Sequence, residues 1–220
     1  MKYYIYISDA KVDMLFPQVP HEIKKKTATE FGVDLKFLVA KKTVESESED
    51  NRIARLETVV SFIREYGNVG SIDEPDEYVE GTLAMRFVSI PTDESLMYVT
   101  GHTDRTSVGL GGSSRHLIGS SGDSSIKWAN DSLAFAILHN LGSAIRYSDS
   151  DDNLRGIAYR SLEHIDSLEH IDKIEHDSLE KRRVDESIEF LAKRLLFHVG
   201  DFSYHSQVLL ATPLYLAKAD

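Results

Sequence analysis

Cysteine is absent from this 220-residue chain. Without thiols there is no disulfide, no cysteine-ligated zinc, no iron–sulfur cluster and no thiol catalysis. Long apolar runs are absent too, because no stretch approaches the ~20 residues needed to cross a bilayer. The apolar run near the N-terminus, residues 3–7, is too short for a signal sequence and reads as a first strand. We therefore expect a cytoplasmic protein that does not enter the membrane.

A surplus of positive charge is also lacking. Asp and Glu number 36 against 25 Lys and Arg, which gives a net charge of −11. General nucleic-acid binding needs clustered cations and is not expected, although a small local basic pocket is compatible with this charge. The length and the 41% hydrophobic share are those of an ordinary globular domain. We expect one domain over residues 1–220, with a variable helical or irregular insertion at 148–182.

Apolar patterning predicts a chain in which several strands follow one another with few helices between them. Alternating apolar residues are typical of strands, and spacings of three and four residues are typical of helices. We therefore expect an α+β or mixed α/β fold, with a mixed or antiparallel sheet of about six strands and three or four packing helices. The predicted strands cover 3–8, 35–40, 78–90, 96–101, 106–111 and 207–216, and the predicted helices cover 9–16, 51–66, 128–141 and 184–195.

The end of the first strand carries polar residues that are candidates for ligand contacts. Turns after strands are common ligand sites in α/β sheets, which draws attention to Asp9, Lys11 and Asp13. The same side chains are also explained by a short helix capped at Ser8 or Asp9, with the other charges in solvent. Both interpretations stay open from the sequence.

A glycine-rich stretch over residues 109–119 is the centre of the predicted strand region. It lacks the spacing of a phosphate-binding P-loop and of a dinucleotide-binding glycine motif. Glycines let a backbone approach a ligand closely, arginine grips phosphate or carboxylate with two hydrogen bonds, and histidine transfers protons. A glycine-rich bulge between strands explains the stretch equally well. The candidate ligand-binding residues here are Gly111, Gly112, Ser113, Ser114, Arg115 and His116.

A second set of polar candidate residues lies in the loop that connects the predicted strands 96–101 and 106–111. His102 and Asp104 would lie at one end of this hairpin, and His116 follows at its other end. Neither His102 nor His116 stands in the His-x-Thr pattern of two-histidine phosphodiesterases, which weighs against that class. No Gly-x-Ser-x-Gly element supports a Ser-His-Asp triad either.

Histidines also recur in a duplicated hexapeptide, Ser-Leu-Glu-His-Ile-Asp, at residues 161–172. His164, His170 and His176 are six residues apart, which on a helix turns neighbours by about 240°. Metal-binding histidines on one helical face are typically four residues apart, so no metal site is predicted and no cofactor is expected.

Four stretches stand out in the order SDAKVDML at 8–15, LGGSSRHLIG at 110–119, EFLAKRLL at 189–196 and ATPLYLA at 211–217. Together they resemble an uncharacterised family of bacterial, largely actinobacterial, proteins classed as a domain of unknown function. The resemblance spans nearly the whole chain, and the duplicated hexapeptide departs from it. It implies no activity and no catalytic residue, although some relatives occur in signalling or antiviral defence contexts, which hints at a nucleotide-type ligand.

We expect a binding or sensor protein for a small anionic ligand, with Lys11 and the turn at 113–116 as contacts. A nucleotide signal is the favoured ligand. One alternative is a hydrolase or phosphodiesterase, in which His116 or His102 is the acid–base group and Asp9 or Asp104 its partner. The other is a structural or partner-binding module, and homo-oligomerisation stays open.

Overall fold

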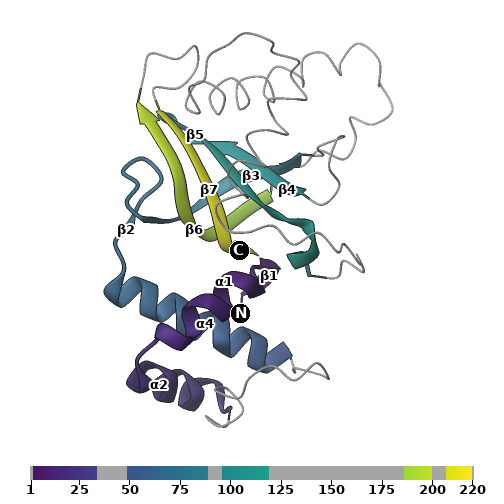
Figure 1. Ribbon diagram of the computed structural model, residues 1–220. Helices are drawn as coiled ribbons and strands as arrows, with labels where there is room; N and C mark the ends of the chain where they lie inside the picture. The colour runs from purple at the N-terminus through teal and green to yellow at the C-terminus, as the bar shows by residue number, and fades with distance from the viewer. Residues whose placement is uncertain (1, 34–48, 89–95, 119–185, 200–206, 220) are drawn as a thin grey trace.

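The computed structural model describes residues 2–33, 49–88, 96–118, 186–199 and 207–219. Within these ranges, strands dominate and three α-helices gather on one side of them (Figure 1). None of the helices found there has the length and apolar character that a membrane crossing requires. The elements, in chain order, are β1 (Tyr3–Ile7), α1 (Asp9–Leu15), a 3-10 turn (Phe16–Gln18), α2 (His21–Phe31), α4 (Glu49–Tyr66), β2 (Val69–Gly70), β3 (Tyr78–Val88), β4 (Leu96–His102), β5 (Thr106–Ser113), a second 3-10 turn (Ser114–His116), β6 (Glu186–Val199) and β7 (Gln207–Lys218).

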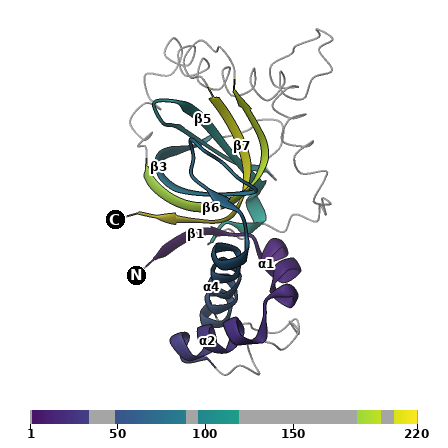
Figure 2. The same cartoon turned by 90° about the vertical axis from the view of Figure 1, so that its left-hand side faces the viewer.

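Five strands close into a barrel in the order β3-β4-β5-β7-β6, because β6 pairs with both β7 and β3. All pairs of the barrel are antiparallel except β5 with β7, which is parallel. Strand β1 adds to β7 beyond the end of β5, and the short β2 adds to β3. Figure 2 shows the closed sheet above the helices, with the two chain ends side by side.

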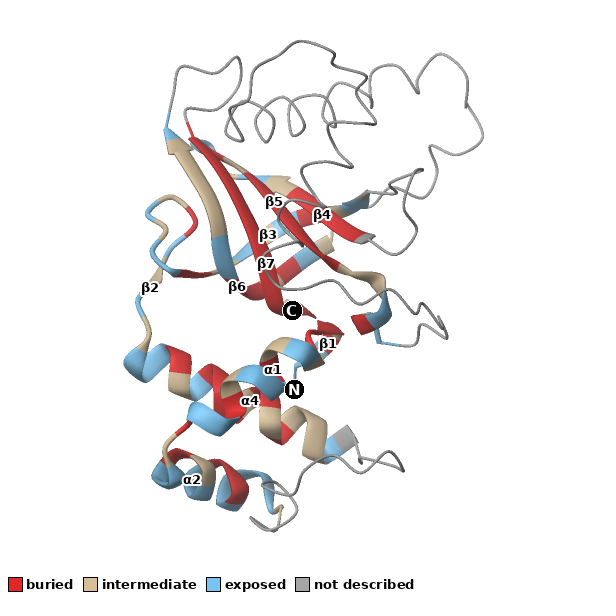
Figure 3. Cartoon of the chain, in the orientation of Figure 1, coloured by how far each residue is buried: buried red, intermediate tan, exposed pale blue. Residues whose placement is uncertain are grey.

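The predicted fold class is therefore wrong: the structure is not an open sheet with packing helices. Closure buries one face of every barrel strand against the opposite wall, so the interior needs no helix to cover it. That interior is filled by side chains, among them Met85, Val99, Leu110, Phe190 and Leu216. Helices α1 and α4 lie beside the outer face of β1, β6 and β7, and α2 packs on α4. A second apolar cluster, which includes Phe16, Leu56, Leu191 and Tyr215, joins the helices to these strands. Figure 3 shows buried residues in both layers in red.

The helix predicted over 184–195 is β6 in the structure. Ile188, Phe190 and Ala192 alternate regularly and face the barrel interior, while Leu191 lies on the other face, against the helices. Because both faces of this part of the strand are covered, apolar residues occur on both, and their spacings of three and four imitate a helix. The one bulged residue of β6, Leu195, comes only after these positions.

Other predicted elements agree with the structure. The helix expected over 51–66 is α4, the short helix after Ser8 is α1, and the strands expected at 3–8, 96–101 and 207–216 are β1, β4 and β7. Helix α2 was not predicted: it begins directly after Pro20 and ends at Gly32, whose φ is +65°. The strand predicted at 35–40, the helix at 128–141 and the insertion at 148–182 lie outside the described residues.

Candidate functional site

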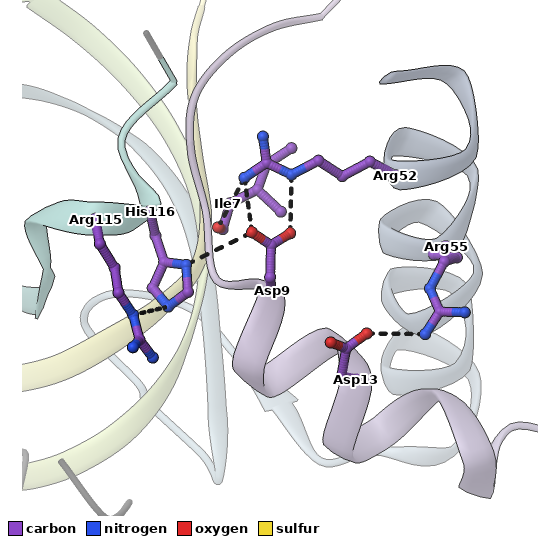
Figure 4. Close-up of polar contacts among 7 residues, drawn as sticks. All are labelled: Ile7, Asp9, Asp13, Arg52, Arg55, Arg115 and His116. Carbon is purple, nitrogen blue, oxygen red and sulfur yellow. Dashed lines mark hydrogen bonds and ion pairs between the residues drawn. The ribbon is translucent and has the colours of Figure 1, made fainter. Parts of the chain in front are cut away.

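A chain of charged and polar side chains crosses from α4 through the start of α1 to the turn after β5 (Figure 4). It consists of Arg52, Asp9, His116 and Arg115, and we call it the Asp9–His116 site. The two outer members are arginines from elements far apart in the sequence. The two inner members meet because the barrel brings the end of β5 beside the end of β1.

Asp9, the first residue of α1, is gripped by Arg52 of α4. The Nε of Arg52 donates to Oδ1 of Asp9 at 2.8 Å, and an Nη donates to Oδ2 at 3.0 Å. The same Nη reaches the Ile7 carbonyl at 3.4 Å. This two-pronged contact fixes the carboxylate and offsets its charge, with each side chain about a quarter exposed, at 25% and 27%.

His116 lies against the other side of the same carboxylate. Its Nδ1 is 3.6 Å from Oδ2 of Asp9, and its side chain is only 9% exposed. The Nε of Arg115 donates to Nε2 of His116 at 3.3 Å. Because Nε2 accepts this hydrogen bond, the neutral ring carries its proton on Nδ1, which faces Asp9. The arginine itself is exposed.

The turn after β5 is held in place by backbone contacts to β1. Residues 114–116 form one turn of 3-10 helix, after which Leu117 bridges to Tyr6. The N–H of Ile118 then donates to the Ile5 carbonyl at 2.8 Å. These contacts attach the turn to the free edge of β1 and so fix His116 beside Asp9.

Tyr6 forms the buried floor of the site. Its side chain is fully buried, and its ring meets His116 edge-on with 5.9 Å between the ring centroids. Burial raises the pKa of Tyr6, while the nearby Ser8 hydroxyl and Arg115 guanidinium lower it less strongly. The space for this side chain comes from Gly112, because a Cβ there would stand 2.4 Å from the Tyr6 hydroxyl oxygen.

The glycine-rich stretch is thus mostly strand. Gly111 and Gly112 are buried within β5, whereas Ser113 and Ser114 are half-buried where the strand turns into the 3-10 turn. Arg115, exposed in that turn, has His116 as its hydrogen-bond partner. In the part of the chain that is described, no carboxylate lies within ion-pair distance of Arg115.

Lys11 has a different set of partners. Its Nζ donates to the Ser8 hydroxyl at 3.2 Å and to the Pro213 carbonyl at 3.1 Å. Burial lowers the pKa of Lys11 to about 8, with no contribution from Arg115. The expected convergence of Lys11 and Arg115 on one ligand is therefore not visible in their contacts.

The remaining candidates lie elsewhere. His102 and Asp104 are exposed at the opposite end of the β4–β5 hairpin, and the eight residues of β5 separate them from His116 by roughly 25 Å. Asp13 forms an ion pair with Arg55 of α4 at 2.8 Å, which fastens α1 to α4. Among the described residues, no group of three or more potential ligands is placed to hold a metal ion, and the histidines of the hexapeptide lie outside them.

Tyr6 and Arg52 belong to the site but are not predicted by the sequence. The pattern places Arg52 in a helix, and its separation from Asp9 along the chain carries no local signal. Tyr6 is predicted only as a residue of the first strand. The Ser8-x-x-Lys11 spacing at the start of a helix was a usable signal, because it places the two side chains one turn apart.

A family model of proteins of unknown function, DUF7019, matches residues 2–220. Neither the curated proteins nor the solved structures contain a significant match. The expectation of an uncharacterised family that extends over nearly the whole chain is confirmed. The chain therefore belongs to the family of unknown function DUF7019.

Proposed function

We propose that this protein binds a small anionic ligand, such as a nucleotide signal, through Arg115 at the Asp9–His116 site. The observation that carries the proposal is the chain of contacts from Arg52 through Asp9 and His116 to Arg115. An exposed arginine is ordinarily free to sample many rotamers, and ordering it costs up to about 2 kcal/mol. In this site the buried His116 already holds the Nε of Arg115. Ordering the arginine side chain therefore costs less free energy when a ligand binds.

Charge also supports an anion as the ligand. The site contains one carboxylate and two guanidiniums beside the histidine, which leaves a net positive charge. Against a whole-chain charge of −11, this local charge makes the turn selective for anions without making the protein generally adhesive to nucleic acid.

The geometry of Arg115 specifies how the anion is held. Its Nε is used by His116, so the two Nη groups form the donor edge that faces a ligand. This edge matches two oxygens of one phosphate or carboxylate group. The Ser113 and Ser114 hydroxyls, from the same turn, are the second set of contacts that we propose.

A thermal-shift titration with inorganic pyrophosphate and a panel of nucleotides tests the proposal. A ligand at 100 times its dissociation constant stabilises the native state by about 2.7 kcal/mol, which corresponds to a rise of roughly 5–10 °C in Tm for a chain of this size. Arg115→Ala should abolish the shift. Arg105→Ala, an exposed arginine at the far end of the same hairpin, is the matched control and should retain it. The proposal is rejected if no compound in the panel raises Tm. It is also rejected if Arg115→Ala shows the same rise in Tm as the unmodified chain.

A hydrolase is the second candidate, and the contact between His116 and Asp9 favours it. A carboxylate on Nδ1 orients an imidazole whose Nε2 then serves as a general base. In the structure Nε2 accepts from Arg115, so an anion that draws the guanidinium away would release this nitrogen for a water molecule. Turnover of a bound nucleotide that is lost in His116→Gln, with binding retained, would favour this function over a sensor.

A further inference from the structure

Ser8 occupies the position before α1 at which serine ordinarily caps a helix. A capping serine accepts a hydrogen bond from a backbone N–H of the first turn. The Ser8 side chain makes no such bond. Its Oγ instead accepts from Nζ of Lys11 at 3.2 Å, so the hydroxyl is directed at an amine one turn along the helix.

Lys11 is an unusual lysine because both of its partners are neutral oxygens. Its Nζ donates to Ser8 and to the Pro213 carbonyl, and within the described ranges no carboxylate pairs with it. The amine is desolvated, which lowers its pKa to about 8. About a tenth of the amine is therefore unprotonated at pH 7, whereas for an ordinary lysine this fraction is below about one in a thousand.

We propose that Ser8 and Lys11 form a nucleophile–base pair that accepts an acyl group from a small ester. A hydroxyl becomes a competent nucleophile when a neighbouring base takes its proton, and serine–lysine pairs do this on unrelated folds. The 3.2 Å contact between Oγ and Nζ is within the distance that direct proton transfer requires. This inference is independent of the anion site, since it uses neither Arg115 nor His116.

The proposed reaction balances with the groups present and one water molecule. The unprotonated Lys11 amine takes the Ser8 proton as Oγ forms a bond to the ester carbonyl carbon. The bond from that carbon to the leaving oxygen breaks, and Lys11 returns the proton to the departing alcohol. Water then attacks the acyl-serine, which releases a carboxylic acid and regenerates the hydroxyl.

Burial limits the size of the acyl donor. Ser8 is only 2% exposed. The Ser8 hydroxyl also lies close enough to the Tyr6 phenol to lower the pKa of that phenol. Lys11 is half-buried and forms the more open side of the pair. A narrow acyl or sulfonyl group is therefore expected to react, and a bulky aromatic one is not.

Methanesulfonyl fluoride is a suitably narrow probe, since sulfonylation of a serine releases only hydrogen fluoride. The full chain should acquire one sulfonyl group on Ser8, located by peptide mass spectrometry, and none in Ser8→Ala. Lys11→Met should slow this reaction at least tenfold, because removal of a general base typically costs 10²–10⁴-fold. Lys24→Met is the matched control: burial also lowers the pKa of Lys24, but its amine lies over the Phe16 ring.

The pH profile of the unmodified chain keeps the test decisive even if Lys11→Met does not fold. The sulfonylation rate should rise with pH and level off above about pH 8, where the Lys11 amine is deprotonated. A serine without a base would instead gain about tenfold per pH unit without a plateau in this range. No adduct on Ser8, a rate unchanged by Lys11→Met, or a profile without a plateau would overturn the proposal.

Discussion

The hydroxyl of Tyr6 lies so close to Gly112 that a Cβ on residue 112 would be 2.4 Å from its oxygen. Tyr6 is on β1 and Gly112 is near the end of β5, so this contact joins the added strand to the barrel. It also fixes the floor of the Asp9–His116 site, because the Tyr6 ring meets His116. The glycine is explained by this packing, without any ligand.

Gly112→Ala should therefore destabilise the fold. An extra methyl in a packed core typically costs 1–3 kcal/mol, and here it would meet the ring of Tyr6, which is fully buried. Urea unfolding measures the loss. Tyr6→Phe in the same chain should restore part of it by removing the hydroxyl, whereas the loss in Gly32→Ala, where φ is +65° and no atom is near, should be insensitive to Tyr6. Equal losses with and without the hydroxyl would contradict this account.

Local patterns were sufficient for elements with regular periodicity. Helix α4 was predictable because Leu56, Val60 and Ile63 recur on one buried face. Strand β6 was not, since it carries apolar residues on both faces, toward the barrel interior and toward the helices, so they do not alternate with polar ones. The closed barrel was not predictable for a related reason: it depends on β6 bridging β3 and β7, and no local pattern encodes such a pairing.

The candidate site was predictable in its members more than in its geometry. Residue type and position indicate Asp9, Arg115 and His116, yet Asp9 and His116 are 107 positions apart in the sequence. Their contact exists because Leu117 and Ile118 attach to the edge of β1. Lys11 and Arg115 were expected to face one ligand, but the side chain of Lys11 turns to Ser8 and Pro213.

The tautomer of His116 is a direct prediction of the site. We expect the proton on Nδ1 in the neutral ring, because Nε2 accepts from Arg115 and Nδ1 faces Asp9. Nitrogen-15 NMR of the histidine rings distinguishes the two forms. Arg115→Ala removes the donor and should allow the Nε2–H form to appear. A ring that carries its proton on Nε2 in the unmodified chain would contradict the assigned contacts.

The two arginines of α4 should contribute unequally to the attachment of α1. Arg52 makes two hydrogen bonds to Asp9. Arg55 makes one to Asp13, whose side chain is 45% exposed. Double-mutant cycles with alanine should give a coupling of about 1–2 kcal/mol for Arg52 with Asp9, and only a few tenths for Arg55 with Asp13. Equal couplings would show that the second contact is stronger than its exposure implies.

Asp73 should make the far end of the barrel sensitive to acid. Hydrogen bonds from the Thr103 and Thr106 hydroxyls, each at 2.6 Å, hold the pKa of this carboxyl below its ordinary value. Since the folded pKa is the lower one, Asp73 contributes stability above about pH 4, and this contribution is lost as pH falls through the folded pKa. Asp73→Asn should therefore flatten the stability curve in acid. Chemical unfolding from pH 6 down to pH 3 measures the change, with Asp76→Asn as a control from the same loop.

Lys11 should produce a pH dependence of the same sign, in the alkaline range. Its folded pKa of about 8 lies below the ordinary value of 10.5, so the unfolded chain binds more protons between these values. Stability should therefore rise with pH across this window, by up to about 3 kcal/mol. The comparison with Lys11→Met isolates the effect, because tyrosines and other lysines titrate alike in both chains. The variant should be the more stable of the two at pH 7, with the difference shrinking toward pH 10. If the difference in stability between the two chains stays constant from pH 7 to pH 10, the Lys11 amine is solvated in the folded chain. The plateau expected above about pH 8 in the sulfonylation rate of Ser8 would then also be absent.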